Sequence, residues 1–214
     1  MKVSISVGLL LLVATVKVWA AETPSTAMLA TCAGCHGDQG QGNAALGAPS
    51  LAGQHAEYLA LQLRNFKAGR RGYDAKDTHG AQMRAMVAQL DEADFERLAR
   101  HYARLESPQP QVEVGEQAAQ GKAFYQGTCA SCHGPEGEGF ALLKTPNLRI
   151  LDAPYLDRQL KHYVLGVRGS EAHSDQLGLW MRGISLQIGG DVERKALIDY
   201  IGSLSAAASS GDKH

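Results

Sequence analysis

An eleven-residue phrase occurs twice in the chain and contains all four of its cysteines. The first copy, CAGCHGDQGQG, begins at Cys32, and the second, CASCHGPEGEG, begins 97 residues later at Cys129. Each copy places a histidine directly after its second cysteine, at His36 and His133. On a helix, residues i, i+3 and i+4 lie on one face, so each copy presents two thiols and one imidazole on the same side.

The spacing C-x-x-C-H is the attachment signature of c-type haem. The two thiols add to the haem vinyl groups as thioethers, and the adjacent imidazole can then face the iron. A structural zinc site would need four converging ligands, and an exported chain could instead form two disulfides. Neither alternative gives a reason for a histidine after each second cysteine. We therefore expect two covalently bound haem c groups, held by Cys32, Cys35, His36, Cys129, Cys132 and His133.

The repeat extends well beyond the cysteines. Residues 47–72 align with residues 144–169 at the same offset of 97, and after one inserted residue the match continues at 98, where Met83 meets Met181. Two copies of one small domain explain this alignment. The expected organisation is domains at 21–105 and 118–205, an extended proline-containing linker at 106–117 and a disordered tail at 206–214.

Apolar side chains recur at helical spacing in both halves. The stretch 57–67 places several of them on one stripe. Asp91 followed by Asp94 resembles a capping box before a stripe that ends at Tyr102, and Asp191 opens the corresponding stretch of the second half. No region shows sustained strand alternation, so the sequence predicts an all-α fold of two domains, each wrapped around one haem.

Each iron needs a second ligand opposite its histidine, and the repeat indicates methionine. Met83 and Met181 both begin the dipeptide Met-Arg, and each precedes an apolar residue by seven positions. A thioether ligand would raise the reduction potential. Met86 is expected in the core instead, because its equivalent in the second half is isoleucine. His79 and His173, in loops shortly before the two methionines, are the alternative ligands.

Other residues could serve the haems indirectly. Pro49 and Pro146 each follow a haem histidine by thirteen residues. Their carbonyls could accept the second ring N–H of that histidine, or the prolines could only shape turns. Arg70, Arg71 and Arg168 could pair with haem propionates, or could simply be solvated.

The first twenty residues predict a secretory signal. Lys2 precedes an apolar run at 5–16, and small residues at Ala20 and Ala21 suit a signal-peptidase cut. Retention of this segment as an anchor is the alternative. Cleavage would leave 19 Lys plus Arg against 22 Asp plus Glu, a net charge of −3. A mildly acidic chain of this kind is not expected to bind nucleic acid, which favours a basic surface.

The chain resembles the tandem dihaem cytochromes c of the cytochrome c4 family over nearly all of its mature length. The features that carry the resemblance are CAGCHG, CASCHG, the Pro-x-Leu stretches, YLALQLRNFKAG, MRAMVAQL and MRGISLQI. It implies two class I cytochrome c folds that face each other, and an electron shuttle in the periplasm. It further implies that the carbonyls of Pro49 and Pro146 hold the haem histidines. The implied axial pairs are His36 with Met83 and His133 with Met181.

One departure from the family pattern concerns the first domain. Class I domains usually carry a glycine and an aromatic residue eight and four positions before the first cysteine. The second domain has both, at Gly121 and Tyr125, whereas the first has Pro24 and Met28. We therefore expect the first helix of this domain to be short, with an altered contact to the helix that contains Tyr102.

An iron with both axial positions filled by protein has no open site for a substrate, so we expect outer-sphere electron transfer and no catalysis. The expected donor is a quinol-oxidising complex or a dehydrogenase, and the expected acceptor is a terminal oxidase. Loose membrane association fits this role. The first alternative is a cytochrome subunit of a periplasmic dehydrogenase that oxidises sulfur compounds or alcohols. The second is a dihaem enzyme such as a peroxidase or a thiosulfate dehydrogenase.

Overall fold

The computed structural model describes residues 23–107 and 115–211 of the chain. These two ranges are helical and contain no strand, although an isolated bridge joins Asn43 to Ala48. The expected all-α class is therefore confirmed. The predicted signal at 1–20 and linker residues 108–114 lie outside the described residues, and the domain borders stay predictions.

The first domain is a small helical unit built on the contact between α2 and α4. Its core contains Leu59, Leu98 and Tyr102, each at most 8% exposed. The capping box predicted at the start of α4 is present, since Asp91 and Asp94 each accept a bond from the other's backbone N–H. The elements are α1 (Thr26–His36), the 3-10 turn η1 (Ala44–Leu46), α2 (Ala56–Lys67), α3 (Thr78–Val87) and α4 (Glu92–Ala103).

The second domain repeats this order with a longer start. Helix α5 (Ala118–Phe124), the π-helical turn η2 (Tyr125–Cys129) and α6 (Ala130–His133) follow one another without a break. Helix α5 crosses α9 closely, because a Cβ atom at Gly121 would lie 2.0 Å from the Ala196 carbonyl oxygen. The remaining elements are α7 (Ala153–Val164), α8 (Gln176–Ser185) and α9 (Asp191–Gly211).

The first helix of the first domain is short, as the missing glycine and aromatic residue predicted. Helix α1 begins only at Thr26, after Ser25 caps it by accepting a bond from Met28 N. The side chains of Met28 and Leu29 pack, partly buried, against the cluster that contains Tyr102. In the second domain, Gly121 and Tyr125 contact α9. In the first domain, the packing of the Met28 and Leu29 side chains takes the place of that contact.

The tail differs from the expectation of disorder. Helix α9 continues to Gly211, through residues predicted to be unstructured, and residues 212–214 lie outside the described part of the chain. The physical reason is local. The segment 206–208 is three alanines, which have the highest helix propensity, and extending an existing helix avoids the cost of nucleation. Absence of apolar periodicity does not by itself end a helix.

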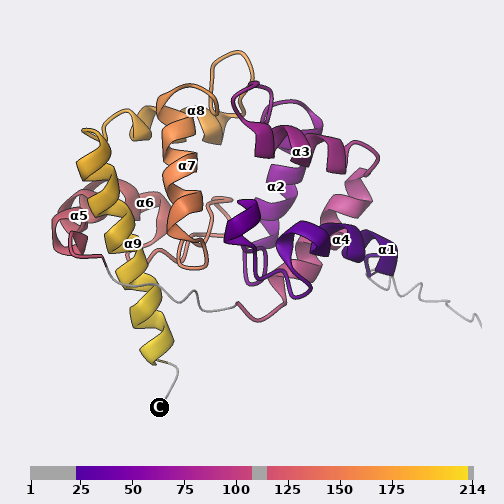
Figure 1. Ribbon diagram of the computed structural model, residues 1–214, viewed down its shortest axis with the longest axis horizontal. Coiled ribbons are helices and arrows are strands. Elements are labelled where there is room, and N and C mark those ends of the chain that lie inside the picture. Colours follow the sequence, from indigo (N-terminus) through magenta and orange to yellow (C-terminus); the bar gives the residue numbers. More distant parts are fainter. Residues whose placement is uncertain (1–22, 108–114, 212–214) are drawn as a thin grey trace, which may run out of the picture.

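The two domains face each other, with α2 and α7 on their inner sides (Figure 1). The side chain of Gln54 pairs with the backbone of Asn147 through two bonds, to its oxygen at 3.0 Å and from its nitrogen at 2.8 Å. In the opposite direction, Arg158 of α7 donates to the Gly47 carbonyl at 2.6 Å. Contacts in both directions fix the placement of the two cysteine motifs relative to one another.

Candidate haem-binding sites

The first motif lies at the end of α1. Cys32 is half-buried, Cys35 is exposed, and His36 is only 6% exposed. The helix stops directly after the histidine because Gly37 adopts a φ of 81°, in the left-handed range that glycine tolerates. His36 Nδ1 lies 2.8 Å from the Pro49 carbonyl oxygen. This bond leaves Nε2 as the ring nitrogen available to an iron.

The second motif has a similar arrangement, with Cys129 at the end of η2 and with Cys132 and His133 in α6. Cys129 is half-buried and Cys132 is exposed, while His133 is 8% exposed. Its Nδ1 lies 3.4 Å from the Pro146 carbonyl oxygen, a longer contact than in the first domain. The geometry places both prolines where a carbonyl orients the ring of a metal-binding histidine.

Burial sets the protonation states of the histidines and of one cysteine in the two motifs. Burial lowers the pKa of His36 and of His133, against the opposing effect of the proline carbonyls, and neutral imidazole is the form that binds metals. Burial raises the pKa of Cys129 to about 11. All four thiols are free, and no cluster of three or more His, Cys, Asp or Glu side chains occurs in the described ranges.

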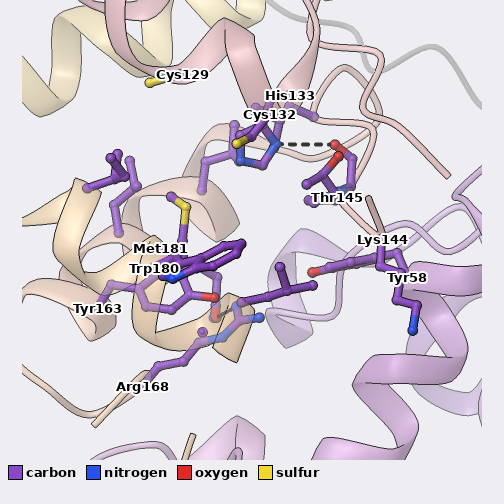
Figure 2. A pocket seen from close by; sticks show the side chains of 18 of the residues that line it. Tyr58, Cys129, Cys132, His133, Lys144, Thr145, Tyr163, Arg168, Trp180 and Met181 are labelled. Carbon is purple, nitrogen blue, oxygen red and sulfur yellow. Dashed lines mark hydrogen bonds between the residues drawn. The ribbon is translucent and has the colours of Figure 1, made fainter. Parts of the chain in front are cut away.

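A cavity lies beside the second motif, and His133 and Met181 both line it. Figure 2 shows the sulfur of Met181 pointing toward the ring of His133, with Trp180 next to it. Apolar side chains form much of the remaining wall, among them Leu148, Leu156, Leu160, Leu197 and Ile201. Two thiols, one imidazole and one thioether around an apolar cavity are a donor set that fits a haem c group.

The candidate methionine of the first domain lies on α3. Met83 packs, partly buried, against the cluster of Phe66, Val87 and Phe95. Met86, expected in the core, is 46% exposed, so that expectation is wrong. Met83 packs against this cluster, whereas Met86 is not among the side chains that contact it.

The two alternative histidines are occupied elsewhere. The ring of His173 stacks on Tyr73 of the first domain, with centroids 4.3 Å apart, and His173 is not among the residues that line the cavity. The ring of His79 lies against Gly47. Met181, and not His173, is therefore the candidate second ligand that lines the cavity beside His133.

Two of the three candidate arginines are buried between the domains. Arg71 and Arg168 are each 8% exposed and line the cavity together with Arg70. Their guanidinium groups lie over aromatic rings of their own domains, Phe66 at 4.5 Å and Tyr163 at 4.6 Å. Their hydrogen-bond acceptors include Tyr155 and Gln159, which sequence reasoning did not single out. The repeat could have indicated these two acceptors, because the residues 97 positions before them are also a tyrosine and a glutamine.

Two helical domains, each with a C-x-x-C-H motif whose histidine is buried and held by a carbonyl, define a dihaem c-type cytochrome. The cytochrome c family model matches residues 22–103 and 118–205. The chain therefore belongs to the cytochrome c family, as a tandem dihaem member of the cytochrome c4 type. It carries two covalently bound haem c groups and transfers electrons.

The proteins similar to this chain include cytochromes c4 and electron acceptors of thiosulfate dehydrogenases. A cytochrome c4 of Stutzerimonas stutzeri is 42% identical, covering 82% of this chain and 85% of its own. A thiosulfate dehydrogenase electron acceptor of Thiomonas intermedia is 34% identical, covering 92% of this chain and 88% of its own. The crystal structure of reduced recombinant cytochrome c4 from Pseudomonas stutzeri matches with a TM-score of 0.67 and 29% identity, over 84% of this chain and 98% of that one. The expected family and fold are thereby confirmed.

Proposed function

We propose that this protein is a periplasmic electron carrier whose two irons are each held by one histidine and one methionine of the chain. The axial pairs are His36 with Met83 and His133 with Met181. The observation that carries the proposal is the orientation of Met181 toward His133 across the cavity of the second domain (Figure 2). The first domain supports it through the equivalent positions of its histidine and methionine.

The residues around each site then have separate tasks. The four thiols anchor the haems as thioethers, at Cys32, Cys35, Cys129 and Cys132. The carbonyls of Pro49 and Pro146 fix the ring orientation of the two histidines. The methionine thioethers raise the reduction potentials. With one histidine and one methionine of the chain holding each iron, no position would remain for a substrate, so the protein would act as a carrier and not as an enzyme.

The proposed location rests on the N-terminal segment. Residues 1–20 have the charge and the apolar run of a secretory signal, and haem c attachment is compatible with an exported chain. No helix in the described ranges combines the length and the apolar character that a membrane crossing needs. The donor would be a quinol-oxidising complex or a dehydrogenase, and the acceptor a terminal oxidase.

A second candidate function is the acceptor of a thiosulfate dehydrogenase. Two relatives have that name, from Thiomonas intermedia at 34% identity and from Stutzerimonas stutzeri at 29%. A solved thiosulfate dehydrogenase, TsdBA of Marichromatium purpuratum, matches 80% of this chain with a TM-score of 0.62, and this chain covers 36% of it. In this role the protein would take electrons from sulfur-compound oxidation before passing them on.

A redox titration of the holoprotein tests the proposal. Methionine bound to ferric iron gives a weak absorption band at the red edge of the visible spectrum. We expect this band at the intensity of two haems, two positive potentials and no rapid binding of carbon monoxide. A missing band, or one haem that binds carbon monoxide at once, would contradict the axial assignment and favour an enzyme.

Stopped-flow mixing separates the two roles. The oxidised protein is mixed with a thiosulfate dehydrogenase plus thiosulfate, and in parallel with the quinol-oxidising complex plus quinol. Fast reduction only by the dehydrogenase supports the acceptor role, and fast reduction by the quinol-oxidising complex supports the general carrier.

A further inference from the structure

The two methionine helices begin at equivalent aspartates. Asp77 caps α3 by accepting a bond from Gly80 N at 2.8 Å, and Asp175 caps α8 by accepting one from Gly178 N at the same distance. Each methionine follows its aspartate by six residues. Because an N-cap fixes the first turn of its helix, the two aspartates set where these helices start and how they are oriented.

Each capping aspartate is also contacted by the inner helix of the other domain. Asn65 of α2 donates from Nδ2 to Asp175 Oδ2 at 2.8 Å. His162 of α7 points its Nδ1 at Asp77 Oδ1, at 3.8 Å. The repeat aligns Asn65 with His162 at the same offset of 97 that relates the cysteine motifs. The same position is therefore an amide in one half and an imidazole in the other.

The contact of Asn65 with Asp175 is shorter than the contact of His162 with Asp77. The Asn65 bond has full hydrogen-bond length, and an amide does not titrate. The His162 contact is too long for a hydrogen bond, and its Nδ1 is buried without a hydrogen-bond partner in the described ranges. The side chains of His162 and Asp77 are only 12% and 3% exposed. Protonation would turn this ring nitrogen into a charged donor facing a buried carboxylate.

The charges around His162 set the conditions for protonation. Burial lowers its pKa from the ordinary 6.5, and three cations oppose a further charge: Arg158 on the same helix, and Arg71 and Arg168 from the turns after α2 and α7. Asp77 acts in the opposite direction and favours the charged form. His162 is therefore neutral at neutral pH and becomes charged on acidification.

We propose that Asp77 and Asp175 are positioning residues for Met83 and Met181, and that the contact of His162 with Asp77 gives the first haem site a proton sensitivity that the equivalent contact does not give the second. This inference rests on the proposed axial role of the two methionines. A proton taken from solvent onto His162 Nδ1 pairs with Asp77 and adds positive charge at the start of α3, the helix that carries Met83, the candidate ligand of the first site. The added charge favours the reduced state of that site, so its potential rises on acidification.

Thermodynamic linkage makes the effect reciprocal. An electron that enters the first site raises the affinity of His162 for a proton, and the proton is released to solvent when the electron leaves. The second site lacks this response, because Asn65 holds Asp175 without titrating. The two halves of one repeat thus differ in how their potentials depend on pH.

Redox titrations of the holoprotein at a series of values between about pH 5 and 8 test the inference. The two haems are followed separately through the NMR signals of their axial methionines. In the wild type, we expect the potential of the first haem to fall with rising pH more than that of the second. His162→Asn, which copies the residue of the other half, should remove the difference. Asn65→His should give the second haem the same dependence.

One further variant and one spectrum separate the explanations. Asp77→Asn keeps a capping side chain but removes the charge, so it should also remove the extra pH dependence while leaving the methionine band in place. If His162→Asn changes the unfolding temperature but not the pH dependence, the contact is only structural and the inference is overturned. If the wild type lacks the methionine band, the axial assignment itself fails, and the proposed function fails with it.

Discussion

Arg168 donates from Nη2 to Gln62 Oε1 at 2.9 Å across the domain interface, and Arg71 makes the reciprocal bond to Gln159 Oε1 at 3.0 Å. The repeat relates the two arginines, and likewise the two glutamines, by 97 residues. One set of side chains therefore builds the interface twice, in opposite directions. A duplicated domain that packs against its copy in this way uses the same arginine and glutamine positions on both sides of the interface.

Replacing Gln159 by leucine should destabilise the protein. Its Oε1 accepts bonds from Arg71 at 3.0 Å and from Arg168 at 2.6 Å, and both arginines are buried. We expect a loss of about 2–4 kcal/mol in the free energy of unfolding, since hydrogen bonds to charged groups contribute roughly 1.5–3 kcal/mol each. Urea unfolding of the holoprotein measures it. The control is Gln120→Leu on the exposed side of α5, and equal midpoints for the two variants would contradict the prediction.

Gly121→Val should disrupt the contact between α5 and α9. A Cβ atom at this position would lie 2.0 Å from the Ala196 carbonyl oxygen, which is backbone and cannot move aside cheaply. We expect a loss of about 1–3 kcal/mol or more from overpacking. Thermal unfolding followed by circular dichroism measures the change.

Gly127, six residues after Gly121 in the adjoining turn η2, provides the control. A Cβ atom at Gly127 would meet nothing within 4 Å, so Gly127→Ala should keep or slightly raise the unfolding temperature. Equal effects of the two substitutions would contradict the assignment of the loss to the close helix crossing.

The cysteine motifs and the repeat predicted most of the site, because their geometry is local. In C-x-x-C-H the spacing alone puts Cys32, Cys35 and His36 on one helix face. The placement of Pro49 beside His36 followed from the family resemblance. The repeat alignment reduced five methionines to the pair Met83 and Met181.

Contacts between the domains could not be read from the sequence in this way. The pairing of Gln54 with Asn147 joins residues 93 positions apart, and Asn147 has no matching partner in the first half. The link between His162 and Asp77 depends on how the two domains dock. Local periodicity contains no information on that docking. The extension of α9 to Gly211 was missed for the opposite reason, since it depends on intrinsic propensity and not on packing.

The ion pair between α7 and α9 should contribute to acid sensitivity. Burial raises the pKa of Asp157, but hydrogen bonds from Arg194 at 2.8 Å and Lys161 at 2.7 Å outweigh it and lower the pKa below its ordinary 3.8. A depressed folded-state pKa means that this stability is present above the unfolded pKa and is lost as pH falls through the folded pKa. In Asp157→Asn, the free energy of unfolding should therefore fall less steeply than in the wild type as the pH drops below about 4.

The size of this effect is limited by solvent, because the Asp157 side chain is 36% exposed. We expect the variant to lose less than about 1 kcal/mol at neutral pH. Urea midpoints measured at neutral pH and at several acidic values check it. Glu171→Gln, on an exposed loop, is the control, and parallel acid profiles for Asp157→Asn and the wild type would refute the assignment.

Met83→His should convert the first site to two histidine ligands. We expect the potential of one haem to fall and the red-edge absorption band to lose about half its intensity, because imidazole replaces the thioether that raises the potential. Spectroelectrochemistry of the variant holoprotein measures both. Met86→Leu is the matched control on the same helix, since Met86 is 46% exposed and its loss should leave both readouts unchanged. A loss of the band in Met86→Leu and not in Met83→His would reassign the ligand to Met86.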